Sequence, residues 1–99
     1  MLPIDEIAYF YRRNDTNFLR TTKGEDFFIN ESLDEVQQQL PERRFFRANR
    51  QLIVHRKALK GFDLLSYGKL EATLVPPIDE EVVISQKRAA AFKKWIGAA

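Results

Sequence analysis

The sequence alternates between apolar and polar residues over most of its length, and this period of two residues constrains the fold more than any other feature. Residues 69–75, Lys-Leu-Glu-Ala-Thr-Leu-Val, place an apolar side chain at every second position, as in a strand with one buried face. The alternating segments are short and are separated by Gly, Asn, Asp and Pro, which favours antiparallel sheets. Because 99 residues allow one hydrophobic core, we expect a single, mainly β domain over residues 1–99.

The predicted strands fall into two groups on either side of a short helix. Three strands form an opening meander over residues 4–30, with turns at Asn14-Asp15 and at Lys23-Gly24-Glu25. The remaining strands are predicted within residues 45–84: two short strands broken at Asn49-Arg50, a hairpin that turns at Tyr67-Gly68, and a last strand at 82–84.

Two helices are predicted from the residues at their first turns. Ser32 and Glu35 have the spacing of a capping box, in which each side chain accepts a hydrogen bond from a backbone amide of the first turn. This mid-chain helix is expected over residues 33–40, where a proline follows. Ser85 is placed to cap a C-terminal helix, which is expected over residues 86–96.

Charge is distributed unevenly along the chain. Residues 1–42 carry four basic and nine acidic side chains, a net charge of −5, whereas residues 43–99 carry twelve basic and five acidic side chains, a net charge of +7. Seven Lys and Arg residues lie between positions 43 and 60 with no Asp or Glu among them. Like charges so close together repel one another, and an anionic partner would relieve that repulsion.

The composition argues against most kinds of catalytic site. The chain has no Cys and one His, so it offers neither a thiol nucleophile nor a cluster of histidine ligands. His55 ends an apolar strand, where a packed structural role is a better interpretation than that of a general base. Ser85 lacks the flanking glycines of a nucleophile elbow, and the four glycines are too isolated to form a phosphate loop. We therefore expect no enzymatic activity and no bound metal or cofactor.

No segment predicts a membrane span or a secretion signal. The longest aliphatic runs have only a few residues, far fewer than the roughly 20 apolar residues that cross a bilayer. The N-terminus turns acidic without a preceding basic stretch, unlike a secretory signal. A cytoplasmic location is therefore expected.

Three basic segments carry features that a merely solvated surface does not need. Residues 47–51, Arg-Ala-Asn-Arg-Gln, combine donors for phosphate with amide groups that pair with base edges. Residues 12–17 place a second basic and polar stretch between two strands. Lys87 and Arg88 lie in the first turn of the terminal helix, where cations are disfavoured unless a phosphate binds there as well. These segments favour a nucleic acid as the partner, with a role in solubility as the alternative.

Four segments, in this order along the chain, carry a resemblance to a known family. They are Ile7-Ala8-Tyr9-Phe10 with Asn17-Phe18-Leu19, then Phe45-Phe46-Arg47-Ala48-Asn49-Arg50-Gln51-Leu52-Ile53-Val54-His55, then Gly68-Lys69-Leu70, and last Val83-Ile84-Ser85-Gln86-Lys87-Arg88 before Phe92-Lys93-Lys94-Trp95-Ile96. Through these segments nearly the whole chain resembles the LytTR DNA-binding domain. The resemblance implies antiparallel sheets stacked in an elongated sandwich, with a short mid-chain helix and a short C-terminal helix.

Members of that family are usually output domains of bacterial response regulators, and the resemblance implies sequence-specific binding of double-stranded DNA by loops that enter the major groove. It also implies paired promoter repeats, a homodimer on that DNA, and an N-terminal receiver or other regulatory domain outside this chain. Carried over by position, Asn17, Arg50 and Lys87 would read bases. The positions that match or flank contacts to the DNA backbone are Lys69, Arg88, Arg13, Gln51, Asn49 and Arg47.

Two other functions are left open by the sequence. Arg43 and Arg47 have the Arg-x-x-x-Arg spacing found in PilZ-type cyclic-dinucleotide domains, although the second motif of that family is absent. A protein-interaction domain that uses exposed strand edges and aromatic side chains is the other alternative. Phe45, Phe46 and Trp95 are better interpreted as core residues, because each lies in a segment with regular apolar spacing.

Overall fold

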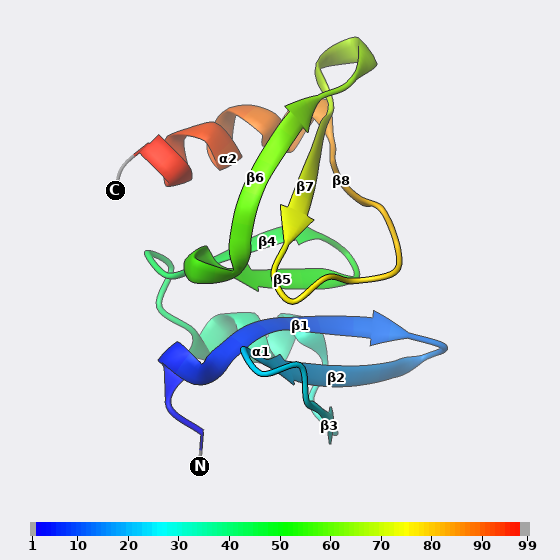
Figure 1. Cartoon of the computed structure of the whole chain (residues 1–99), viewed down its shortest axis with the longest axis vertical. Helices are drawn as coiled ribbons and strands as arrows, with labels where there is room; N and C mark the ends of the chain where they lie inside the picture. Colours follow the sequence, from blue (N-terminus) through cyan, green and yellow to red (C-terminus); the bar gives the residue numbers. More distant parts are fainter. Residues whose placement is uncertain (1, 98–99) are drawn as a thin grey trace.

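The computed structural model describes residues 2–97, which form two antiparallel sheets and two helices (Figure 1). One sheet has the strand order β3-β2-β1-β5-β4, and the other has the order β6-β7-β8. The predicted mainly β fold, with one helix in mid-chain and one near the C-terminal end, is confirmed. The elements are β1 (Ile7–Arg13), β2 (Thr16–Thr21), β3 (Asp26–Ile29), α1 (Leu33–Gln39), β4 (Phe45–Asn49), β5 (Leu52–His55), β6 (Leu59–Leu64), β7 (Leu70–Leu74), β8 (Val82–Ile84) and α2 (Gln86–Gly97), with short 3-10 helices η1 (Ile4–Glu6), η2 (Arg56–Ala58) and η3 (Ser66–Gly68).

The five-stranded sheet lies between two layers. Because side chains alternate along a strand, Leu52 and Val54 of β5 pack against the three-stranded sheet and α2, whereas Ile53 packs against α1 on the opposite face. Phe92 of α2 is fully buried and lies edge-on to Phe46, with 5.4 Å between ring centroids. The three-stranded sheet and α1 therefore cover opposite faces of the larger sheet, in a molecule that measures 37 × 30 × 24 Å (Figure 1).

The first strand begins later than the sequence predicts. Residues Ile4–Glu6 form a 3-10 turn, closed by a hydrogen bond from the Ile7 amide to the Ile4 carbonyl, so β1 starts at Ile7. It continues to Arg13 because Asn14 and Asp15 adopt φ values of 52° and 61° and close a two-residue hairpin, a conformation that Asn and Asp tolerate better than most residues. The long β1–β2 hairpin carries the basic segment 12–17 at its tip.

The capping box predicted at the start of α1 is present. Ser32 Oγ accepts a hydrogen bond from the Glu35 amide at 3.1 Å, and Glu35 Oε1 accepts one from the Ser32 amide at 2.9 Å. The helix ends at Gln39, one residue earlier than predicted, because Leu40 is already extended at φ −98° and ψ 146°. A residue before proline is driven out of the helical region by the proline ring.

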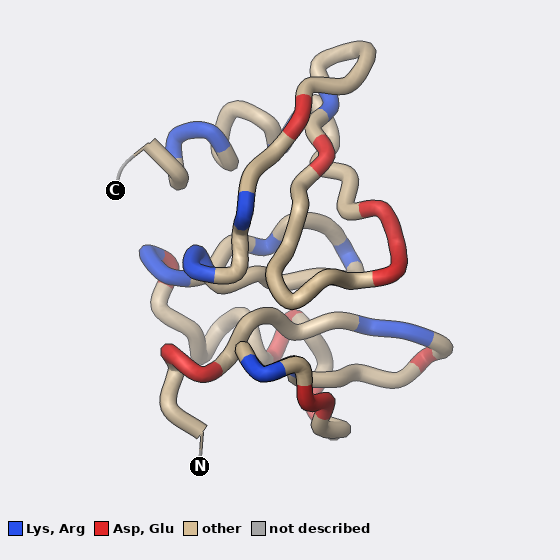
Figure 2. The backbone as a smooth tube through the Cα atoms, in the orientation of Figure 1, with Lys and Arg blue, Asp and Glu red and all other residues tan. Residues whose placement is uncertain are grey.

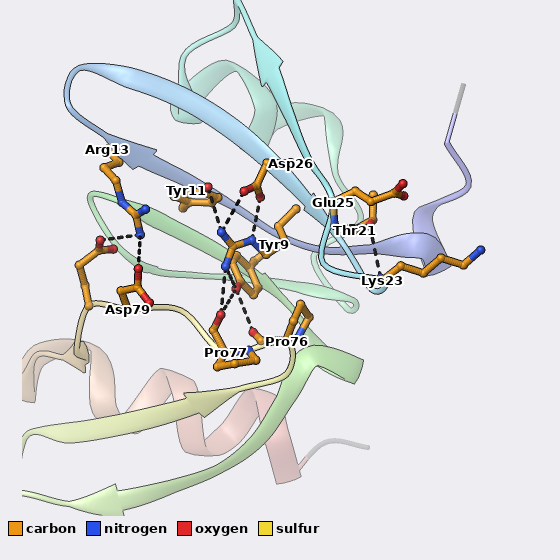
Figure 3. Close-up of polar contacts among 12 residues, drawn as sticks. Tyr9, Tyr11, Arg13, Thr21, Lys23, Glu25, Asp26, Pro76, Pro77 and Asp79 are labelled. Atoms are coloured by element: carbon orange, nitrogen blue, oxygen red, sulfur yellow. Dashed lines mark hydrogen bonds and ion pairs between the residues drawn. The ribbon is translucent and has the colours of Figure 1, made fainter.

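Arg20 of β2 joins the five-stranded sheet to the loop between β7 and β8. Its guanidinium donates to the two carboxylate oxygens of Asp26 at 2.7 and 3.0 Å, to the Tyr9 hydroxyl at 2.9 Å and to the Pro77 carbonyl at 3.0 Å (Figure 3). The Tyr9 hydroxyl donates in turn to the Pro76 carbonyl at 2.9 Å. Hydrogen bonding to Arg20 lowers the pKa of Asp26, and burial raises the pKa of Tyr9. The charged Asp26 and the neutral Tyr9 are thus the forms that the fold stabilises.

His55 has the structural role that its position in an apolar strand predicts. The side chain is buried, its Nδ1 accepts a hydrogen bond from the Lys57 amide at 2.9 Å, and its ring lies edge-on to Phe45. Burial lowers the pKa of His55, against an opposing effect from the Asp5 carboxylate, 3.7 Å from Nε2, and with a further lowering by Lys57 and Arg44. The neutral imidazole is therefore the form that the folded chain holds.

We expect the thermal stability to fall as the pH drops below about 6.5, the pKa of an unperturbed His. The unfolded chain then binds a proton at His55 that the folded chain does not, so the free energy of unfolding decreases by at most about 1.4 kcal/mol per pH unit. Thermal melting followed by circular dichroism between pH 7.5 and 5.5 measures this. The variant His55→Asn, which keeps an acceptor for the Lys57 amide and does not titrate, should show a flatter profile; an equal slope would contradict the assignment.

Candidate nucleic-acid interface

Three of the segments that the sequence singled out lie next to one another in the fold. The loop between β4 and β5 consists of Arg50 and Gln51. It lies between two hollows, both bordered by Asn49, the last residue of β4. The larger hollow, of about 680 Å³, extends from this loop to Lys69, which follows η3, and to the start of α2, and the smaller, of about 330 Å³, extends from it to the end of β1. In Figure 1 the β1–β2 and β4–β5 turns point to the same side of the molecule. Basic and amide residues that line the two hollows are Arg12, Arg13, Arg47, Asn49, Arg50, Gln51, Lys69 and Arg88.

The β4–β5 loop presents Arg50 at its tip. Arg50 and Gln51 are exposed, and Asn49 is half-buried beneath them. The Asn49 side chain accepts a hydrogen bond from the Gln51 amide at 2.8 Å and donates to the Val83 carbonyl at 3.3 Å. A second anchor comes from β1, because the Arg12 amide donates to the Gln51 carbonyl at 2.9 Å. Asn49 therefore shapes the loop that carries Arg50 and ties it to β8.

Arg47 lies behind this loop, with its side chain only 16% exposed. Its guanidinium donates to the carbonyls of Asn49 and Arg50 at 2.8 and 2.9 Å, and to Asp34 and Gln37 of α1 at 2.8 and 2.9 Å. A guanidinium has five N–H donors, so these four bonds leave one. Arg47 thus links α1 to the β4–β5 loop through hydrogen bonds. The sequence had suggested that it contacts the DNA backbone.

The start of α2 and the segment after η3 form the other side of the larger hollow. Lys69, Lys87 and Arg88 are all exposed. The Arg88 guanidinium lies 4.6 Å from the centre of the Phe46 ring and donates to the Arg47 carbonyl at 2.7 Å. Arg88 therefore has a fixed position, and the exposed Lys69 and Lys87 add positive charge near the amide end of α2, where an anion is favoured.

In the first hairpin, the side chain that the sequence suggested is buried, and a nearby guanidinium is exposed. Asn17 is only 8% exposed, its Oδ1 accepts a hydrogen bond from Arg12 Nη1 at 3.1 Å, and its Nδ2 donates to the Glu31 carbonyl at 2.9 Å. Arg12 has a side chain that is 41% exposed and also lies 3.4 Å from the Asp15 carboxylate. No signal in the local sequence distinguishes the buried amide from the exposed guanidinium, because the Glu31 carbonyl comes from a distant turn.

Arg13 faces the acidic loop between β7 and β8. Its Nη2 lies 2.7 Å from Glu80 and 4.0 Å from Asp79 (Figure 3), and its guanidinium lies 5.3 Å from the centre of the Tyr11 ring. This loop forms a continuous acidic stretch in Figure 2, and its Glu80 and Glu81 line the smaller hollow. A phosphate that approaches Arg13 would therefore have to replace a carboxylate.

Several of the seven basic residues between positions 43 and 60 have partners within the chain. Arg44 and Lys57 lie 3.5 and 3.6 Å from the Asp5 carboxylate, and Arg56 donates to the Trp95 and Ile96 carbonyls in the last turn of α2. Arg47 is hydrogen-bonded to α1 and to the β4–β5 loop, so four of the seven basic residues have partners within the chain. The run contains no acidic residue of its own, but Asp5 and Asp34 from other parts of the chain partly neutralise it in the fold.

The alternative of a cyclic-dinucleotide site gains little from this arrangement. Arg47 has its guanidinium occupied, so the Arg43 and Arg47 pair offers little to a cyclic dinucleotide. Phe45 and Phe46 are buried in the core, as predicted, whereas Trp95 is half-buried and packs against the core. Among residues 2–97, no group of three or more acidic or His side chains is arranged to hold a metal ion. Neither of the two described α-helices has the length and apolar character that a membrane crossing requires.

Comparison with known proteins agrees with this fold. The chain matches the sequence model of the LytTr DNA-binding domain over residues 1–97. None of the curated proteins matches it. Among solved structures, the LytTr DNA-binding domain of a Bacillus cereus protein described as a methyl-accepting/DNA response regulator has a TM-score of 0.81, with 22% identity over 97% of this chain and 85% of that one. The chain therefore belongs to the LytTr DNA-binding domain family.

Proposed function

We propose that this domain binds specific sites in double-stranded DNA through loops that enter the major groove, as the output domain of a transcriptional regulator. The observation that carries the proposal is Arg50, an exposed arginine at the tip of the β4–β5 loop. Hydrogen bonds to the Arg47 and Asn49 side chains and to the Arg12 amide hold the backbone of this loop. A loop of fixed shape can hold a side chain against a base edge, and Arg is best suited to the O6 and N7 atoms of guanine.

Further contacts are assigned from charge and exposure. We propose that Lys87 reads a second base and that Lys69 neutralises a phosphate, since both are exposed beside the amide end of α2. We propose that Gln51, Arg88 and Arg13, which line the two hollows, contact the DNA backbone. We assign Arg47 and Asn49 to holding the β4–β5 loop.

The family suggests how the domain is used. We propose a bacterial response regulator, or a related cytoplasmic regulator, in which a receiver or another regulatory domain controls this one. Two copies would then occupy paired repeats in a promoter as a homodimer on the DNA.

We expect Arg50→Ala to weaken binding to the preferred duplex by about 1 to 3 kcal/mol, and to weaken binding to a scrambled duplex much less, because base contacts specify and phosphate contacts do not. The preferred duplex is the one that the wild-type domain selects from a randomised pool. Fluorescence anisotropy with both duplexes at the same salt concentration gives the two dissociation constants.

A matched control removes a positive charge elsewhere. Lys23 lies in the turn between β2 and β3, at the other end of β2 from the β1–β2 turn near Arg12. The variant Lys23→Ala should leave the affinities for the preferred and the scrambled duplex almost unchanged. Equal losses of Arg50→Ala on the preferred and the scrambled duplex would count against base reading. If the wild-type domain prefers no duplex over any other, sequence-specific binding itself is disproved.

A further inference from the structure

We propose that Arg12 is the side chain of the β1–β2 hairpin that contacts a base, and that Asn17 is its positioning residue. The inference rests on the proposed function, because it assigns a further specificity-determining residue within the same DNA-binding surface. Asn17, the position that the family resemblance selects, is buried. Arg12, whose guanidinium Asn17 binds, has an exposed side chain.

The Asn17 side chain has little left to offer a base. To recognise adenine, an Asn must accept a hydrogen bond with its oxygen and donate one with its nitrogen in the same plane. In this fold the oxygen already accepts from Arg12 at 3.1 Å and the nitrogen donates to the Glu31 carbonyl at 2.9 Å. Reading a base would require both bonds to break in a side chain that is 8% exposed.

Arg12, by contrast, is held and still has free donors. Two of its five N–H groups are engaged, by Asn17 Oδ1 at 3.1 Å and by Asp15 Oδ1 at 3.4 Å. Asp15 has a side chain that is 98% exposed, so it supports the guanidinium from the solvent side without enclosing it. A guanidinium fixed by two acceptors loses less rotamer entropy when it binds, and three N–H groups stay available for the O6 and N7 atoms of a guanine.

The position of Arg12 places it beside Arg50 along one surface. The Arg12 amide donates to the Gln51 carbonyl at 2.9 Å, so the β1 strand end and the β4–β5 loop are joined through their backbones. Arg12, Gln51 and Asn49 line the smaller hollow, while Arg50 lies on the larger one. Arg13, the neighbouring residue, is paired with Glu80 at 2.7 Å, which leaves Arg12 as the more available of the two guanidiniums for a base.

The test compares four variants on the duplex that the wild-type domain selects from a randomised pool, and on a scrambled duplex. Arg12→Ala is expected to weaken binding to the selected duplex about tenfold or more, and binding to the scrambled duplex by less than about threefold. Arg12→Lys should behave like Arg12→Ala on the selected duplex, because a lysine keeps the charge and loses the planar fork. Asn17→Asp keeps an oxygen for Arg12 and should keep most of the preference, whereas Asn17→Leu should lose it.

The outcomes separate the possible roles. If Arg12→Lys binds both duplexes like the wild type, Arg12 is a phosphate contact and the proposal is wrong. If Asn17→Asp loses the preference while Arg12→Ala keeps it, Asn17 itself reads the base. Because substitution at the buried Asn17 could unfold the domain, melting curves are recorded for each variant, and the two Arg12 variants decide alone if needed. Retained preference in Arg12→Ala, together with its loss in Arg50→Ala, overturns this inference and leaves the proposed function intact.

Discussion

Replacing Arg20 with Ala is expected to lower the free energy of unfolding by about 2 kcal/mol. This is less than the roughly 3 to 5 kcal/mol that breaking a fully buried ion pair costs, because the Asp26 side chain is 36% exposed. The Arg20 side chain is 15% exposed and joins Asp26, the Tyr9 hydroxyl and the Pro77 carbonyl. Its removal leaves these polar groups without their partner, and each poorly solvated group adds a penalty. Urea unfolding followed by circular dichroism measures the change.

The pH dependence gives an independent readout of the same network. Since hydrogen bonding to Arg20 lowers the pKa of Asp26, the wild-type domain gains stability above the unfolded pKa of about 4 and loses it as the pH falls below that value. Arg20→Ala should lose less stability over this acidic range. Lys23→Ala, an exposed charge in the adjacent turn, is the control and should be neutral. A loss below about 1 kcal/mol in Arg20→Ala would show that the network contributes little.

Replacing Arg47 with Ala is expected to impair folding and DNA recognition together. Four hydrogen bonds disappear, two of them to the carbonyls of the β4–β5 loop, so we expect a loss of about 2 to 3 kcal/mol in unfolding free energy. Because the loop then no longer holds Arg50 in one place, the preference for the selected duplex should fall as well. Anisotropy at a temperature well below the melting transition separates the two effects.

A double-mutant cycle tests whether Arg47 affects DNA recognition only through Arg50. If Arg47 acts on DNA only through the position of Arg50, the double variant Arg47→Ala/Arg50→Ala should bind the selected duplex about as weakly as Arg50→Ala alone. Additive losses would instead mean that Arg47 contacts DNA itself. Arg43→Ala is the matched control, since this exposed arginine lies at the opposite end of the β4–β5 hairpin from Arg50.

Local patterns predict local structure well in this chain. The capping box at Ser32 and the two-residue turn at Asn14-Asp15 depend on side chains within a few positions of one another, and both form. The start of β1 is wrong by three residues. Ile4 is β-branched like a strand residue, but the hydrogen bond from the Ile7 amide to the Ile4 carbonyl closes a 3-10 turn there. Which strands pair across the sheet is a different matter: β1 lies beside β5, with Tyr9 opposite Val54, and no period in the sequence specifies that register.

The candidate site shows the same division between local and distant causes. The exposed position of Arg50 follows from a short loop between two strands. The burial of Asn17 depends on the Glu31 carbonyl, and the partial neutralisation of Arg44 and Lys57 depends on Asp5, which is far away in the sequence. A charge count along the chain therefore overstates the positive charge that faces a partner. Contacts that fold distant segments together decide which side chains stay free.

The hydrogen bonds around the β4–β5 loop also bear on the entropy of DNA binding. Fixing the backbone of one flexible residue costs about 1 to 2 kcal/mol, and a loop that became ordered only on DNA would pay this for each of its residues. Here Arg47, Asn49 and the Arg12 amide order the loop backbone in the free protein. Binding then immobilises chiefly the Arg50 side chain, and most of the contact free energy remains available to distinguish one base from another.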